Sequence, residues 1–325
     1  MNILITGGAG YIGSHIVEKL VKQKYQVVII DNLKTGYKRL INKKSIFIKA
    51  DINNKKNLIK TIKKYKIQTI FHLAACLNVS DAEKYRKKYY KNNVLGTKTI
   101  LETCKNSSVI NFIFSSSCSV YGNVSGAVSE KRKLKPSGYY AQTKLQAEKL
   151  VIRYSKKYKL KFGILRYFNV AGASDSGKCG EIEKSHGHLI KNLAIQSLKK
   201  KPQIKIYGND YKTYDGTCVR DYIHVSDLTD IHLKSLEYLN NKKKSFTLNC
   251  GYGKGYSVKE IVNIFKKIKK RTIIKYSKKR PGDVAKVYAN NNKIKKLFGW
   301  KPKNDDIQQI INSAIRWEKK IWLKL

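Results

Sequence analysis

The first apolar run of the chain leads directly into a glycine-rich turn. Residues 2–6 are apolar, residues 7–13 read Gly-Gly-Ala-Gly-Tyr-Ile-Gly, and a helical pattern follows to about residue 21. Glycines in a strand–turn–helix unit allow a tight turn, close approach of the backbone to a pyrophosphate, and close helix–strand packing. The helix N-terminus adds N–H groups and a partial positive charge. The segment therefore predicts a dinucleotide-binding unit, with Gly7, Gly10 and Gly13 in the binding turn.

The end of the second apolar run indicates which dinucleotide binds. Asp31 follows the run 26–30 and lies 18 residues after Gly13. A carboxylate there accepts hydrogen bonds from the adenosine ribose and repels a 2′-phosphate. This favours NAD over NADP, although the nearby Lys34, Lys38 and Arg39 leave NADP as an alternative.

Apolar runs and helical patterns alternate through the first half of the chain. The expected strands are 2–6, 26–30, 45–49, 68–73, 109–114 and 162–166, and the expected helices are 11–21, 55–64, 81–104 and 139–158. Strands that are apolar throughout and separated by helices indicate a parallel sheet covered on both faces. The sequence therefore predicts an α/β fold with a Rossmann-type doubly wound parallel sheet.

The pattern changes after residue 169. Residues 171–188 are rich in Gly, Ser and charge, and a mixed region follows, with helices expected near 189–199, 225–239, 258–268, 291–298 and 305–322 and strands near 204–207, 246–249 and 272–276. We therefore expect an NAD-binding domain at 1–172, to which a segment near 218–250 returns. A smaller mixed α/β substrate domain is expected at 173–325.

A tyrosine and a lysine are spaced to share one helix face. Tyr140 and Lys144 are four residues apart, which places their Cβ atoms about 5–6 Å from each other. An ammonium group beside a phenol lowers the phenol's pKa from about 10 toward working pH. Ser117, after the strand 109–114, would hydrogen-bond the same substrate oxygen. The set predicts acid–base chemistry on an alcohol or sugar hydroxyl by Tyr140, with the adjacent Tyr139 as a rival.

The charge balance raises a different class of function. Lys and Arg number 68 against 22 Asp and Glu, a formal net charge of +46. A non-enzymatic nucleic-acid-binding protein is therefore an alternative. The lysines occur as short runs throughout the chain and form no single basic tail. We interpret them as solvated surface residues and expect no specific nucleic-acid partner.

Cysteine usage and hydropathy exclude other classes. The six cysteines are scattered singly without a CxxC pair, so neither a zinc clip nor a disulfide framework is predicted, which suits a reducing cytoplasm. No run approaches 18 apolar residues and no signal peptide is recognisable, so no membrane association is expected. His186 and His188 lack a carboxylate cluster with metal spacing, so we expect no metal.

Further motifs resemble the extended short-chain dehydrogenase/reductase family and, within it, the UDP-glucose 4-epimerases. The resemblance covers essentially the whole chain. Besides the glycine turn and Tyr140–Lys144, the matching segments are 31–33, 72–75, 92–97, 115–122, 165–169, 207–210, 215–225 and Arg-Pro-Gly-Asp at 280–283.

The resemblance implies an isomerase that inverts C4 of UDP-glucose and UDP-galactose, with tightly bound NAD and a 4-keto sugar intermediate. It also implies a cytoplasmic homodimer acting in galactose metabolism. The implied catalytic residues, which also contact NAD, are Ser117, Tyr140 and Lys144, and Ser117 and Tyr140 also bind substrate. The other implied NAD contacts are Tyr11, Ile12, Asp31, Asn32, Asp51, Ile52, Leu73, Ala74, Ala75, Asn93 and Phe168. The implied UDP-sugar contacts are Asn169, His188, Leu189, Lys205, Ile206, Tyr207, Arg220, Arg280 and Asp283.

The sequence departs from the family pattern at several positions. Tyr139 replaces the usual Pro before the catalytic Tyr, and His188 stands where many relatives have Asn. Leu77 and Asn78 replace more typical residues near the nicotinamide pocket. Related dehydratases commonly carry an Asp-Glu pair where this chain has Cys118-Ser119, so we expect no net elimination of water. A dehydratase, a decarboxylase and a 4-epimerase of another UDP-sugar remain the alternatives.

Two arginines and one valine bear on substrate recognition. Arg suits bidentate recognition of a diphosphate, which favours Arg220 and Arg280; ion pairs with Asp221 and Asp283 are the alternative. In the epimerases that the chain resembles, the position four residues after the Asp of the RxGD motif lies beside the sugar, and a large aromatic there excludes a 2-acetamido group. Val287 occupies it, which predicts that UDP-GlcNAc and UDP-GalNAc are also accepted, unless a shifted register places Tyr288 there.

Overall fold

The computed structural model describes residues 1–182, 187–280 and 282–323. The chain forms two compact units, and each is described by itself. The first unit comprises Met1–Gly122, Pro136–Arg166 and Thr229–Leu248; the second comprises Asn123–Lys135, Tyr167–Leu228 and Asn249–Leu325. The predicted domain boundary at 172/173 stays a prediction.

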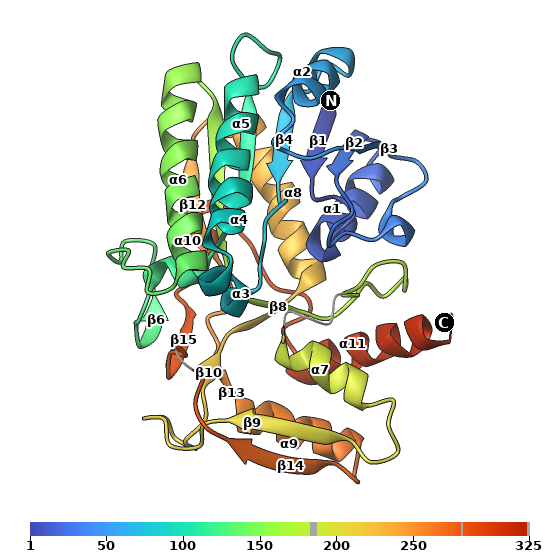
Figure 1. Cartoon of the computed structure of the whole chain (residues 1–325), viewed down its shortest axis with the longest axis vertical. Helices are drawn as coiled ribbons and strands as arrows, with labels where there is room; N and C mark the ends of the chain where they lie inside the picture. The colour runs from blue at the N-terminus through green and yellow to red at the C-terminus, as the bar shows by residue number, and fades with distance from the viewer. Residues whose placement is uncertain (183–186, 281, 324–325) are drawn as a thin grey trace. The chain divides into compact units, whose positions relative to one another are not determined.

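A seven-stranded sheet has the strand order β12-β7-β5-β4-β1-β2-β3 (Figure 1). Its strands are β1 (Asn2–Thr6), β2 (Gln26–Asp31), β3 (Ile46–Lys49), β4 (Thr69–His72), β5 (Asn111–Ser117), β7 (Lys161–Tyr167) and β12 (Phe246–Cys250). The β1–β2, β2–β3, β1–β4 and β4–β5 pairs are parallel, with Leu4 opposite both Val28 and Ile70. The predicted Rossmann-type sheet is confirmed.

Helices bury both faces of this sheet. Its principal helices are α1 (Tyr11–Lys22), α2 (Lys55–Lys64), α5 (Gly96–Thr103), α6 (Tyr139–Tyr158) and α8 (Val225–Lys242). On one face, Leu4 and Ile70 share a core with Ile100 of α5 and Val151 of α6, and these two helices run side by side in Figure 1. Ile3 and Ile5 are fully buried as well, because successive side chains point to opposite faces of the strand.

The helix expected over 81–104 is wrong as a single element. The segment divides into α3 (Val79–Lys84), α4 (Arg86–Tyr89), the π-helical turn η2 (Tyr90–Leu95) and α5. Tyr85 breaks the first junction with a φ of −115° and a ψ of 46°, outside the helical region. In η2 the Asn93 side chain is buried and hydrogen-bonds the backbone of Cys76, so tertiary contacts override the helical pattern here.

The second unit has its own core. Strands β9 (Gln203–Tyr207) and β14 (Ile273–Ser277) are parallel. Their inward residues Ile204 and Ile206 share a core with Phe265 and Ile311. The helices are α7 (Leu189–Gln196), α9 (Val258–Ile268), α10 (Asn292–Phe298) and α11 (Ile307–Trp322). Short strands not expected from the sequence complete the unit: β6 (Gly126–Val128), β8 (Asn169–Ala171), β10 (Val219–Arg220), β11 (Tyr222–His224), β13 (Tyr256–Ser257) and β15 (Lys286–Ala289).

Candidate active site

The glycine turn after β1 closes tightly on itself. Gly7 has a φ of +77°, and a Cβ added at Gly13 would lie 2.2 Å from the Gly7 carbonyl oxygen. The Gly10 N–H donates to that oxygen at 3.1 Å. Gly10 caps α1 without a side-chain hydrogen bond, and the first turn holds no acidic residue, so its N–H groups suit an anion. The backbone here fits the pyrophosphate of a dinucleotide, and Tyr11 and Ile12 begin the helix.

Asp31 lies at the end of β2, held by this turn. Its carboxylate accepts hydrogen bonds from the Ala9 N–H at 3.1 Å and the Leu33 N–H at 2.9 Å. Burial raises the pKa of Asp31, and the two backbone hydrogen bonds oppose that rise. Gly36 packs so close that an added Cβ would lie 2.7 Å from Oδ1. The carboxylate is thus fixed beside the glycine turn, where a ribose hydroxyl would be bound.

Two further predicted cofactor residues contact each other. The Asn32 side-chain amide donates to the Asp51 carboxylate at 3.0 Å. Burial would raise the pKa of Asp51, but hydrogen bonds from Asn53 and Asn32 and the charge of Lys34 hold it below its usual value. Ile52 is buried and lies so close to Gly96 that an added Cβ there would meet its side chain.

The segment after β4 is fixed by side chains acting on backbone groups. The Leu73 N–H donates to the Thr6 carbonyl at 3.1 Å. Leu73–Ala75 therefore lie at the carboxyl ends of β1 and β4, beside the glycine turn. Asn93 accepts from the Cys76 N–H at 2.8 Å and donates to its carbonyl at 3.1 Å. The predicted residues Leu73, Ala74, Ala75 and Asn93 therefore come together.

His72 precedes this segment and was not singled out as a functional residue. Its ring nitrogens hydrogen-bond the hydroxyls of Thr6 at 2.7 Å and Thr97 at 2.9 Å. Burial lowers its pKa to about 3, and the positive charge of Lys144 adds to the effect. His72 is therefore a neutral bridge between β1, β4 and α5.

Ser117 and Tyr140 meet at the end of β5. Ser117 is the last residue of that strand, Tyr140 lies in the first turn of α6, and their hydroxyls are hydrogen-bonded. Burial raises the pKa of Tyr140, and the hydrogen bond to Ser117 opposes the rise. The lowering expected from the sequence is therefore not found.

Lys144 is buried one helical turn after Tyr140. Burial lowers its pKa to about 8, while the charge of Glu148 and the Cys76 thiol oppose that lowering. Its Nζ lies 4.9 Å from the centre of the Phe114 ring. An amine with this pKa changes its charge near working pH, as groups at catalytic sites commonly do.

The rival Tyr139 lies in a different environment. Its N–H donates to the Glu83 carboxylate at 2.7 Å, and the Arg86 guanidinium lies 5.1 Å from its ring centre. Cys118, which follows Ser117 in sequence, and Tyr89, which the sequence did not place near the site, both act on the ionisation of Tyr140. The geometry therefore favours Tyr140 as the phenol of the Ser–Tyr–Lys set.

In the second unit, the two arginines have different partners, and Arg220 pairs with one of the two carboxylates considered in the alternative. Arg220 lies 3.6 Å from the Asp283 carboxylate, and the Arg280 guanidinium stacks 3.9 Å from the Tyr207 ring centre. Asp221 is fully buried and accepts N–H groups from Tyr252, Gly253 and Ala289. Arg220 is thus paired with Asp283 and Arg280 with Tyr207, whereas Asp221 is structural. Pro281 of this motif lies outside the described residues.

The remaining predicted substrate residues lie on β8, β9 and α7. Asn169 begins β8, paired with Tyr222 of β11. His188 caps α7, whose first residue is Leu189, and its Nδ1 lies 2.6 Å from the Glu181 carboxylate. Burial would lower the pKa of His188, but Glu181 raises it above its usual value.

On β9, successive side chains point in opposite directions. Lys205 is exposed with its Nζ 5.3 Å from the Tyr207 ring centre, whereas the Ile206 side chain lies in the core. Phe168 is also buried, and its N–H donates to the Cys250 carbonyl at 3.1 Å. Ile206 can therefore offer a ligand only its backbone.

Strand register separates Val287 from Tyr288. Val287 of β15 is directly opposite Arg220 of β10, so both side chains lie on one face of that sheet. Tyr288 points to the other face, beside Gly255, where an added Cβ would lie 3.2 Å from its ring. Val287 therefore shares a face with the candidate diphosphate-binding arginine, and Tyr288 does not.

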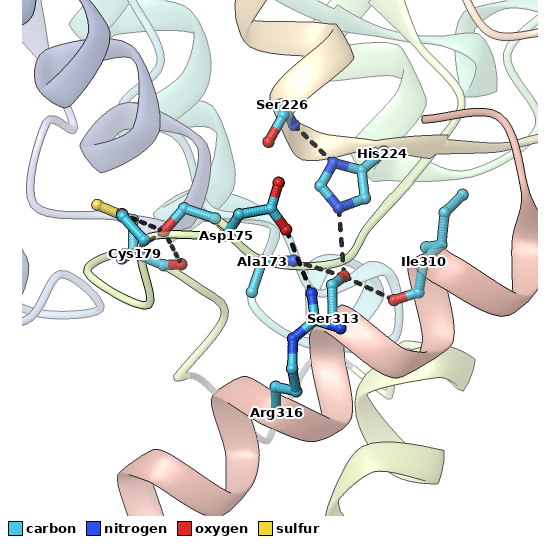
Figure 2. Close-up of polar contacts among 10 residues, drawn as sticks. Ala173, Asp175, Cys179, His224, Ser226, Ile310, Ser313 and Arg316 are labelled. Carbon is cyan, nitrogen blue, oxygen red and sulfur yellow. Dashed lines mark hydrogen bonds and ion pairs between the residues drawn. The ribbon is translucent and has the colours of Figure 1, made fainter. Parts of the chain in front are cut away.

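A buried serine–histidine pair in the second unit is structural (Figure 2). His224 Nδ1 accepts the Ser226 N–H at 3.0 Å, so the neutral ring carries its proton on Nε2, 3.2 Å from Ser313 Oγ. Ser313 donates to the Ile310 carbonyl and accepts the Ala173 N–H. The imidazole therefore cannot accept the serine proton, and the pair joins α11 to the segment after β8.

Other kinds of site were searched among the described residues. No group of three or more His, Cys, Asp or Glu side chains there is arranged to hold a metal ion. His186 lies outside the described residues. Across the described part of the chain, every helix is too short or too polar to cross a membrane.

Comparisons with known proteins were made for sequence and fold. The family model described as NAD dependent epimerase/dehydratase family matches residues 3–251. A UDP-glucose 4-epimerase of Rhizobium meliloti is 38% identical over 321 residues, covering 98% of this chain and 97% of that protein. The UDP-glucose-4-epimerase structure from Stenotrophomonas maltophila, with bound NAD and formylated UDP-arabinopyranose, has a TM-score of 0.94 at 31% identity, covering 100% of both chains. The UDP-Glc/GlcNAc 4-epimerase structure from Campylobacter jejuni has a TM-score of 0.85 at 36% identity, covering 98% of this chain and 99% of that one.

Proposed function

The chain belongs to the NAD dependent epimerase/dehydratase family, and we propose that it is an isomerase that interconverts UDP-glucose and UDP-galactose. The observation that carries the proposal is the hydrogen-bonded Ser117–Tyr140 pair with Lys144 buried one turn away. Ser117 ends β5 of a sheet whose first strand leads into the glycine turn. A hydroxyl-directed acid–base pair and a dinucleotide turn together suit alcohol–ketone chemistry.

NAD would be held by the residues around the turn after β1. The backbone of Gly7–Gly13 and the N-terminus of α1 suit its pyrophosphate, and the Asp31 carboxylate suits its adenosine ribose. Asn32, Asp51, Ile52, Leu73–Ala75 and Asn93 would line the rest of its site. When bound, NAD would supply the hydride acceptor for oxidation at C4 and the hydride donor for the later reduction.

Tyr140 would move the proton of the sugar 4-hydroxyl. Ser117 would hydrogen-bond the same oxygen and keep it in line with the phenol. A charged Lys144 would favour the phenolate, because an ammonium near a phenol stabilises the ionised form. Inversion at C4 would require the 4-keto sugar to present its other face to the cofactor, and Tyr140 would return the proton to the same oxygen.

The UDP group would be anchored in the second unit. Arg220 and Arg280 are planar bidentate donors that match a diphosphate. Tyr207 stacks with Arg280 and, with Asn169, His188, Leu189, Lys205 and the Ile206 backbone, would complete the nucleotide site. Asp283 pairs with Arg220 and would orient it.

The test uses the purified chain without added cofactor. Nucleotide released by denaturation should be NAD, and the native protein should convert UDP-galactose to UDP-glucose. A 4-keto-6-deoxy product identified by mass would instead assign a dehydratase. Absence of turnover together with absence of bound NAD would overturn the proposal.

A wider sugar range is a second proposal at the same site. Val287 shares a sheet face with Arg220, and it lacks the ring with which a tyrosine would fill space beside the sugar. The Campylobacter jejuni relative is described as a UDP-Glc/GlcNAc 4-epimerase. We therefore propose that UDP-GlcNAc and UDP-GalNAc are also substrates. Because the Stenotrophomonas maltophila relative holds a UDP-arabinopyranose derivative, a UDP-pentose is the alternative substrate to assay.

The assembly and cellular location are also proposals. We propose a homodimer acting in the cytoplasm in galactose metabolism, on the resemblance to the UDP-glucose 4-epimerases. Sedimentation equilibrium should give twice the chain mass of 37.3 kDa. A mass equal to one chain at working concentration would contradict the dimer.

A further inference from the structure

A buried network lies next to the Tyr140–Lys144 pair. Glu148, four residues after Lys144 on α6, forms an ion pair with Arg166 of β7, and their side chains are only 3% and 6% exposed. Arg166 Nε donates to Oε1 at 2.9 Å, and Nη2 donates to Oε2 at 2.7 Å. This bidentate contact fixes the direction of the carboxylate.

Two other side chains tie the ion pair to the segment that carries Ser117. The Ser116 hydroxyl donates to Glu148 Oε1 at 2.5 Å, and Ser116 directly precedes Ser117 in β5. Arg166 Nη1 donates to the Tyr121 hydroxyl at 3.0 Å. Tyr121 ends the short helix η3 (Cys118–Tyr121), which begins after Ser117. The network therefore joins α6, β5, β7 and η3 within the first unit.

A contribution to folding stability does not by itself explain the buried Glu148–Arg166 ion pair. Removing two charges from water is costly, and well-packed apolar residues often replace a buried pair without loss of stability. The place of Glu148 suggests another role, because its negative charge raises the pKa of Lys144 while burial lowers that pKa to about 8.

The other groups around Lys144 supply little compensating charge. His72 is neutral at working pH, since burial lowers its pKa to about 3. The Cys76 thiol also raises the pKa of Lys144, but burial raises the pKa of that thiol, so it supplies a negative charge only at alkaline pH. Phe114 presents its ring, whose centre lies 4.9 Å from Nζ, and Tyr140 lies one helical turn before Lys144. Among the described residues, Glu148 is the one carboxylate that acts on Lys144.

We propose that Glu148 is a positioning residue for the catalytic set: its carboxylate, whose direction Arg166 fixes, keeps the Lys144 ammonium charged beside Tyr140 at working pH. The inference rests on the proposed function, because it gives Lys144 a charge that matters only if Tyr140 is the acid–base group.

The test compares kcat–pH profiles of the NAD-loaded enzyme on UDP-galactose. In the wild type, kcat should fall at alkaline pH as Lys144 loses its proton. In Glu148→Gln this fall should move to lower pH by about one unit or more, the effect of removing a nearby opposite charge. Glu148→Asp keeps the charge and should restore the wild-type position. Ser116→Ala, which keeps both charges, is the matched control and should leave the fall in place.

A purely structural role gives a different result. It would lower kcat of Glu148→Gln by the same factor at every pH, and an unmoved alkaline fall overturns the inference. If an unpaired Arg166 prevents folding, the double variant Glu148→Gln/Arg166→Met removes both buried charges. The position of its alkaline fall in kcat is then compared with that of the wild type.

A readout without turnover separates this inference from the proposed function. Ionisation of Tyr140 is measured as the ultraviolet difference between each holoenzyme and its Tyr140→Phe counterpart. Glu148→Gln should require a higher pH for that ionisation, and an unchanged titration overturns the inference. A wild type that leaves UDP-galactose unchanged refutes the proposed function, and the titration still decides the role of Glu148.

Discussion

At the residue scale, the candidate chemistry depends on two side chains whose charges are set by burial. Burial raises the pKa of Tyr140, which favours its neutral form, and burial lowers the pKa of Lys144 to about 8. The positive charge of Lys144 is therefore the variable that the protein controls most directly. Predictions at this scale concern single functional groups.

Removing the phenolic hydroxyl should abolish most of the activity. Tyr140→Phe keeps the ring and loses the proton-transfer group, so kcat should fall by at least about 100-fold. Tyr139→Phe is the matched control, since its ring lies against Arg86 and should contribute little. Near-wild-type turnover by Tyr140→Phe, with a loss in Tyr139→Phe, would transfer the role to Tyr139.

Removing the ammonium should change the pH dependence of the rate. In Lys144→Ala the phenolate loses its nearby cation, so the pKa of Tyr140 rises and activity requires a higher pH. The measurement is the acid limb of the kcat–pH profile. A limb at the wild-type position would show that Lys144 does not act on Tyr140.

The substrate range should depend on Val287. Val287→Tyr adds a ring on the face shared with Arg220, so kcat/KM for UDP-GlcNAc should fall by about 10-fold or more while that for UDP-glucose changes less. Tyr288→Phe, on the opposite face, should affect both sugars equally. Refusal of UDP-GlcNAc by the wild type, or its full acceptance by Val287→Tyr, would exclude Val287 as the gate.

At the element scale, helix ends and strand ends position the site. The π-helical turn η2 places the Asn93 side chain where it hydrogen-bonds both the N–H and the carbonyl of Cys76. The glycine turn places the N-terminus of α1 over the end of β1, with no side chain in the way. Both features depend on backbone geometry that a single added group would disturb.

Adding one methyl group to the turn should weaken cofactor binding. The Cβ of Gly13→Ala would lie 2.2 Å from the Gly7 carbonyl oxygen, so the turn must open. We expect a loss of about 1–3 kcal/mol in stability and a lower NAD content in the purified protein. Gly138→Ala is the control, because its Cβ would meet only the Glu83 carboxylate at 3.6 Å. Equal NAD content in both variants would contradict the assigned role of the turn.

At the scale of the whole molecule, the net charge of +46 is the dominant feature. Uniform positive charge favours solubility but destabilises the folded chain through self-repulsion. Like charges even face each other directly, since Lys205 of β9 is opposite Lys275 of β14. The charge is therefore a property with measurable consequences for stability.

Salt should stabilise this protein. Raising NaCl from about 0.01 M to about 0.15 M shortens the Debye length from about 30 Å to about 8 Å and screens the repulsion. We expect Tm to rise by a few degrees in calorimetry, and an uncharged osmolyte at equal osmolarity should not reproduce the steep initial rise. A Tm independent of salt would mean that the lysines are already compensated.

The same charge decides the alternative of nucleic-acid binding. Binding to a duplex oligonucleotide should be detectable at low salt and weak at about 0.15 M salt, because only nonspecific phosphate contacts form. Fluorescence anisotropy against salt concentration measures this. Tight, sequence-selective binding at physiological salt, with no turnover of a UDP-sugar, would favour the non-enzymatic alternative.

Local patterns in the sequence determined the elements that depend on near neighbours. The strand–turn–helix at the N-terminus, the helices over 55–64, 139–158 and 258–268, and the four-residue spacing of Tyr140 and Lys144 all follow from short-range periodicity and from glycine placement. Parallel strand pairing also followed, since fully apolar strands separated by helices admit few other arrangements.

Only the tertiary structure decided the interactions between residues that are distant in sequence: ion-pair partners, strand register and burial. From sequence, ion pairs with Asp221 and Asp283 were the alternative to diphosphate binding by Arg220 and Arg280. In the structure, Asp221 accepts hydrogen bonds from three backbone N–H groups, and Arg220 pairs with Asp283. The register of β15 against β10 places Val287, and not Tyr288, on the sheet face that carries Arg220. The short strands and the break at Tyr85 escaped prediction because long-range contacts, rather than local periodicity, stabilise them. The burial that raises the pKa of Tyr140 likewise comes from chain segments remote in sequence, which a helix face considered alone does not contain.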